Sequence, residues 1–84
     1  MEQQIRDFII NFFSEKTKFR GLSMHDQLHT NFLESNTLDS IEFITLISEI
    51  ETNFNLLFTE GDIQSPSFST IEGIVKIASD RLNT

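Results

Sequence analysis

The sequence predicts a small all-α protein: a four-helix bundle with three main helices, one short helix and a long first loop. Three observations support this class. Apolar residues recur at helical spacing in three segments, and no segment shows the alternation typical of a β-strand. A chain of 84 residues is also the size of one domain with a modest core. We therefore expect a single domain over residues 1–84, without repeats or a linker.

The first predicted helix covers residues 2–16. Its apolar stripe consists of Ile5, Phe8, Ile9, Phe12 and Phe13. Lys16 and Lys18 near its end suit the negative end of the helix dipole, and Gly21 suits a terminator or turn.

Residues 19–38 are expected to form a long irregular connection, since their apolar residues follow no clear period. Five side chains should hold it against the core: Leu22, Met24, Leu28, Phe32 and Leu33. His25 and His29 are four residues apart, a spacing that would place two metal ligands on one helix face. No further ligand pattern accompanies them, so we expect solvated loop histidines and no metal site.

The second main helix should cover residues 40–53. Asp39 suits the N-cap, and Glu42, three residues later, completes a capping-box pattern. At about 100° per residue, one face carries the core residues Phe43, Leu46, Ile47, Ile50 and Phe54. The opposite face carries Ile41, Thr45, Ser48 and Thr52, with Ile44 at the border. Ile41 is then an exposed apolar side chain beside Ser40.

Two further helices complete the pattern. Residues 59–62 suit the start of a short helix that stops before Pro66, with Ser65 as its boundary. Ser69 suits the N-cap of the last helix, with Glu72 completing a second capping box. The buried stripe of this last helix is expected to contain Ile71, Ile74, Val75, Ala78 and Leu82. Gly73 within it indicates either close packing or simple tolerance.

Composition excludes several classes of function. The net charge is −7, and no Lys or Arg lies between Gly21 and Val75. Such a surface repels nucleic acid and favours basic protein partners, although acidity also serves solubility alone. The chain has no cysteine, which excludes disulfides and cysteine metal sites. We find no apolar run long enough for a membrane span and no signal-peptide pattern, and expect a cytoplasmic monomer.

Ser40 is the strongest candidate functional residue. No base lies beside it in sequence and no Ser/His/Asp arrangement can be argued, so we expect no enzymatic activity. A serine at a helix start is well placed for modification by another enzyme, but it is equally ordinary helix-start chemistry. The residues alone leave both interpretations open.

Residues 38–54, LDSIEFITLISEIETNF, resemble the recognition helix of acyl carrier proteins and their peptidyl and aminoacyl relatives. The Asp-Ser-Leu hallmark of that family reads Asp39-Ser40-Ile41 here. The segments 49–54, 57–60 and 68–71 also match the family pattern, so the resemblance covers essentially the whole chain. Thr37 stands where the family often has Gly, and Thr45 and Ser48 differ from typical fatty-acid carriers.

The resemblance implies a four-helix bundle of the acyl-carrier-protein type. It implies a 4′-phosphopantetheine arm on Ser40, transferred from coenzyme A by a phosphopantetheinyl transferase with magnesium in the transferase complex. Acyl or aminoacyl groups would travel on the arm as thioesters between loading ligases or synthases, and the chain itself would catalyse nothing. Asp39 would cap the helix, and the docking surface would contain Ile41, Glu42, Ile44, Thr45, Ser48, Glu49 and Glu51. The competing hypothesis is an unmodified acidic helical adapter for a basic protein, and the cargo stays open.

Overall fold

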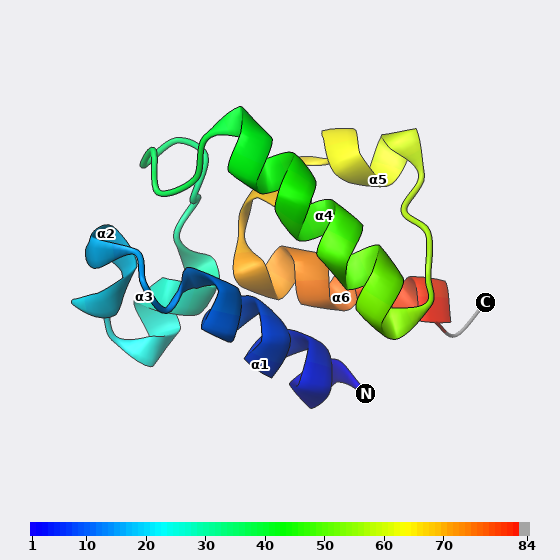
Figure 1. Ribbon diagram of the computed structural model, residues 1–84, viewed down its shortest axis with the longest axis horizontal. Coiled ribbons are helices and arrows are strands. Elements are labelled where there is room, and N and C mark those ends of the chain that lie inside the picture. The colour runs from blue at the N-terminus through cyan, green and yellow to red at the C-terminus, as the bar shows by residue number, and fades with distance from the viewer. Residues whose placement is uncertain (83–84) are drawn as a thin grey trace.

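The computed structural model describes residues 1–82, which form six α-helices and one 3₁₀ helix (Figure 1). The elements are α1 (Glu2–Phe13), α2 (Thr17–Arg20), α3 (Met24–His29), α4 (Ser40–Phe54), α5 (Glu60–Gln64), η1 (Pro66–Ser69) and α6 (Ile71–Leu82). This part of the chain contains no strand, and the predicted all-α class is confirmed. None of the helices in it is long and apolar enough to cross a membrane.

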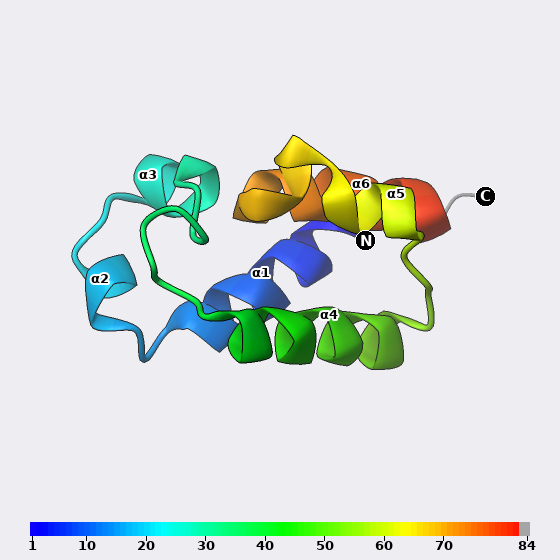
Figure 2. The same cartoon turned by 90° about the horizontal axis from the view of Figure 1, so that it is seen from above.

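The three long helices surround one hydrophobic core. Figure 2 shows α4 on one side of the molecule and α5 and α6 on the other, with α1 between them. The core residues of these helices are Ile5, Ile9 and Phe13 from α1, Leu46, Ile47 and Ile50 from α4, and Ile71, Ile74, Val75 and Ala78 from α6. Several predicted members of the stripes are half-buried instead, namely Phe8, Phe12, Phe43, Phe54 and Leu82.

The predicted long loop is wrong in part, because residues 17–29 contain α2 and α3. The first helix ends at Phe13 instead of reaching Lys16, and Gly21 terminates α2. Packing of aromatic rings explains this path. The Phe13 ring lies 5.0 Å from Phe19 and 5.3 Å from Phe32, measured between centroids. Contacts of this kind fix short helices that have too few residues to be stable alone.

The expected anchors of this region divide into two groups. Phe32 is buried and the half-buried Leu28 packs against the core, so these two side chains contact it as expected. Leu22 is half-buried. Met24 is 57% exposed and Leu33 is 37% exposed, so both were wrongly assigned to the core. Apolar residues without a helical period gave no reliable indication of which side chains face inward.

The predicted short helix is confirmed. Thr59 caps α5, and its hydroxyl accepts a hydrogen bond from the Asp62 N–H at 3.0 Å. The Asp62 carboxylate in turn accepts from the Thr59 N–H at 2.9 Å. Ser65 is extended, as the residue before a proline prefers, and ends the helix.

The start of α6 differs from the prediction. Ser69 belongs to η1, and the Thr70 hydroxyl accepts from the Gly73 N–H at 3.1 Å. Glu72 does not close a capping box, because the cap lies at Thr70, three residues before Gly73 and not three residues before Glu72. Both carboxylate oxygens of Glu72 instead accept hydrogen bonds from Arg6 of α1, at 2.8 and 2.9 Å. A bidentate guanidinium–carboxylate contact of this kind is stronger than a single hydrogen bond to a backbone amide.

Candidate functional site

The candidate site lies at the first turn of α4, where the predicted capping box is present. The Asp39 carboxylate accepts a hydrogen bond from the Glu42 N–H at 2.8 Å. The Glu42 carboxylate accepts from the Asp39 N–H at 3.1 Å. The two residues satisfy each other's backbone donors, so the start of the helix is locally determined.

The segment before α4 is held from the inside. Leu38 is buried, and its N–H and that of Thr37 donate to the Phe32 carbonyl at 3.2 and 3.0 Å. Phe32 itself donates from its N–H to the Ser69 carbonyl at 3.0 Å. Because Leu38 is anchored in the core, the next residues Asp39 and Ser40 emerge at the surface in a fixed position.

Ser40 is exposed and is the first residue of α4. Within residues 1–82 its hydroxyl has no hydrogen-bond partner, and the N–H groups of Ser40 and Ile41 have no acceptor. Unpaired N–H groups at the positive end of a helix favour an anion. A phosphodiester on the Ser40 oxygen therefore fits the residues that surround it.

The outer face of α4 presents two large apolar side chains to solvent: Ile41, as the helical phase predicts, and Ile44, which that phase places at the border. Ile41 is 77% exposed and Ile44 is 64% exposed. Thr45, Ser48 and Glu49 on α4 are exposed as well. The Thr45 hydroxyl donates to the Ile41 carbonyl at 2.9 Å, so this hydroxyl is already occupied within the helix.

Two of the predicted docking carboxylates take part in the fold. Glu42 forms an ion pair with Lys16 in addition to closing the capping box. Glu51 accepts a hydrogen bond from the Phe58 N–H at 2.9 Å and so holds the segment after α4. By contrast, the Glu49 carboxylate has no partner among the residues that the structure describes. Glu49 is thus the most available acidic side chain of the predicted surface.

Leu57 is an exposed apolar residue that the sequence reasoning did not assign to the docking surface. It is 77% exposed, between the buried residues Leu56 and Phe58. The alternation of these three side chains in the connection from α4 to α5 was the available signal. Leu57 lines a surface hollow of about 560 Å³ together with Ser48, Glu51, Thr52, Asn55 and Leu56.

The two histidines lie on α3 and not in a loop, so that part of the prediction is wrong. Their rings stack with centroids 4.4 Å apart, and the His29 Nδ1 lies 2.8 Å from the His25 carbonyl oxygen. Within residues 1–82, no cluster of three or more His, Asp or Glu side chains is arranged to hold a metal ion.

Comparisons of the chain with protein-family models, curated proteins and solved structures give no match. The Asp39-Ser40-Ile41 motif and the geometry of α4 are therefore the features that bear on function.

Proposed function

We propose that this protein is a carrier that bears a 4′-phosphopantetheine arm on Ser40. One observation carries the proposal: an exposed serine with an unpaired hydroxyl begins a capped helix, directly beside the exposed side chain of Ile41. A modifying enzyme needs an accessible hydroxyl on a well-defined element and an adjacent surface to bind. The first turn of α4 offers all three.

The residues present agree with the chemistry of the arm. When bound, the arm supplies the terminal thiol for thioester formation, and the chain has no cysteine of its own for that purpose. The free N–H groups of Ser40 and Ile41 favour the negative charge of the phosphodiester. The role of the chain is to hold and present the arm, and the partner enzymes carry out catalysis.

The outer face of α4 suits brief contacts with a series of enzymes. Ile41 and Ile44 supply apolar contact next to Ser40, and Glu49 supplies an unpaired negative charge farther along the helix. Charge complementarity mainly accelerates and orients the encounter, whereas a small apolar contact holds the complex for a short time. Partners with an apolar patch beside basic residues fit this surface, such as a transferase and a loading ligase or synthase.

Intact-mass spectrometry tests the proposal directly. The chain is incubated with coenzyme A, Mg²⁺ and a phosphopantetheinyl transferase of broad specificity. We expect the mass of one phosphopantetheine to be gained by the wild-type chain and by the control Ser67→Ala, which removes another exposed serine hydroxyl. Ser40→Ala should gain nothing. A wild-type mass that stays constant with several such transferases would refute the proposal.

The alternative is an acidic adapter that binds a basic protein without modification. The absence of Lys and Arg between residues 21 and 75 of the sequence favours it. An adapter predicts partner binding that is unaffected by Ser40→Ala. Partner binding that requires the arm would instead support the carrier.

A further inference from the structure

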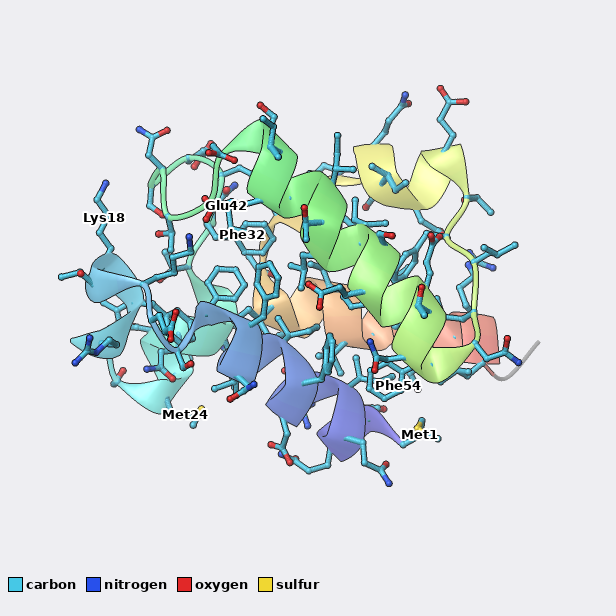
Figure 3. The ribbon with its side chains drawn as sticks, viewed as in Figure 1. Met1, Lys18, Met24, Phe32, Glu42 and Phe54 are labelled. Carbon is cyan, nitrogen blue, oxygen red and sulfur yellow. The ribbon has the colours of Figure 1, made fainter. Side chains whose placement is uncertain are left out.

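Lys16 lies at the start of α4, although it is 26 residues from Glu42 in sequence. It occupies the N-cap position of α2 without a side-chain capping hydrogen bond, and its ammonium group forms an ion pair with the Glu42 carboxylate. The two side chains are 29% and 35% exposed, so the pair is partly shielded from water. Figure 3 labels Glu42 on α4 and Lys18 on α2, the short helix that begins directly after Lys16. The central segment without basic residues therefore has a cation beside its candidate site.

The Glu42 carboxylate joins two parts of the molecule. One oxygen accepts from the Asp39 N–H and closes the capping box, and the other contacts Lys16. A carboxylate held at both oxygens has lost most of its rotational freedom. Lys16 therefore favours the side-chain conformation in which Glu42 fixes the first turn of α4, the turn that contains Ser40.

We propose that Lys16 is a positioning residue for the modification of Ser40, and that it acts through Glu42. The inference rests on the proposed function, since it concerns the reactivity of the same serine. Two physical effects support it. A reacting hydroxyl gains from a fixed orientation. In addition, the Glu42 charge lies two residues from the site of the incoming phosphodiester, and Lys16 offsets the repulsion between these like charges.

Lys18 offers a matched control. It lies two residues from Lys16 and carries the same charge, but its ammonium group donates to the Ser35 carbonyl oxygen at 3.0 Å. Lys18 thus contacts a neutral acceptor before α4 and not the capping box. Lys16→Gln and Lys18→Gln change the net charge equally, and only the first removes the ion pair with Glu42.

The first measurement is hydrogen exchange of the Asp39 and Glu42 amides in the unmodified chain. We expect exchange to be about two- to fivefold faster in Lys16→Gln, the factor that corresponds to a partly exposed ion pair. Lys16→Arg and Lys18→Gln should exchange like the wild type. The Thr59 amide donates to Asp62 in the capping box of α5, which no lysine contacts. Its exchange rate should therefore be the same in every variant. The inference would be overturned if the Asp39 and Glu42 amides exchanged at the same rate in Lys16→Gln as in Lys18→Gln.

The second measurement is kcat/KM for transfer of the arm from coenzyme A to each variant. The kcat/KM of Lys16→Gln should be about two- to fivefold lower than that of the wild type. Lys16→Arg and Lys18→Gln should have the wild-type kcat/KM. A role in stability alone would lower the melting temperature of Lys16→Gln without changing kcat/KM, and would count against the inference. If the wild-type chain accepts no arm, the proposed function fails. If it accepts the arm as fast as Lys16→Gln does, only the role of Lys16 fails.

Discussion

The helices α4 and α6 both bury an apolar stripe, but they use their outer faces differently. In α6 the large apolar residues are all buried or half-buried, and Glu72 and Arg81 are occupied by partners on α1 and α5. In α4 two isoleucines are directed to solvent, at 77% and 64% exposure. Apolar side chains on an outer face contribute little to folding. The large apolar side chains of α6 thus all contribute to the core, whereas two of those in α4 lie outside it.

The largest expected effect separates the two faces of α4. Ile50 is fully buried, and Ile50→Ala should lower the free energy of unfolding by about 2–5 kcal/mol, because it removes core contacts and leaves a cavity. Ile44→Ala makes the same substitution on the outer face and should lower the free energy of unfolding by less than about 0.5 kcal/mol. Urea denaturation measures both. Similar losses in the two variants would contradict the assigned helical phase.

The next effect tests the close packing at the start of α6. A Cβ at Gly73 would lie 1.7 Å from the Ser67 carbonyl oxygen, so Gly73→Ala forces the backbone of η1 to move. We expect a loss of about 1–3 kcal/mol in the free energy of unfolding. Gly21→Ala is the control, because a Cβ there meets no atom within 4 Å. Urea denaturation measures the free energy of unfolding of each variant. A Gly73→Ala chain as stable as the wild type would show that α6 has room at this position.

Acid should weaken the contact between α5 and α6. The Arg81 guanidinium, which donates to Asp62 at 2.7 and 2.8 Å, lowers the pKa of that carboxyl from 3.8 to about 2. A pKa that is lower in the folded than in the unfolded chain adds stability above about pH 4, and this is lost as the pH falls toward 2. Asp62→Asn should therefore unfold more easily than the wild type at pH 7 and similarly near pH 2. Thermal unfolding across this range measures the difference, and equal stability at pH 7 would contradict it.

The smallest effect on stability is expected at Ile41. Ile41→Glu should change the free energy of unfolding by less than about 0.5 kcal/mol, because the side chain is already in water. Transfer of the arm to Ser40 should be impaired, since a charge replaces apolar contact beside the serine. Ile41→Leu keeps the apolar contact and is the control. A large drop in melting temperature for Ile41→Glu would show that this face of α4 is not free.

The sequence predicted features set by neighbouring residues better than features set by contacts between residues far apart in the chain. The start of α4 was predicted correctly because Asp39 and Glu42 are three residues apart and satisfy each other locally. The segment 17–29 was predicted less well, because α2 and α3 have only 4 and 6 residues and lack a complete periodic pattern. Ring packing of Phe19 and Phe32 against Phe13 determines their path. Such packing leaves no local signal in the sequence.

The helical phase of α4, its cap and the exposure of Ile41 beside Ser40 follow from the order of residues alone. These features arise within one or two turns of helix, where residue spacing fixes geometry. The packing of the helices, in contrast, sets which carboxylates have partners. It paired Glu42 with Lys16 across 26 residues and Glu72 with Arg6 across 66. Contacts at such separations depend on how the whole chain closes around its core, and residue type alone does not specify them.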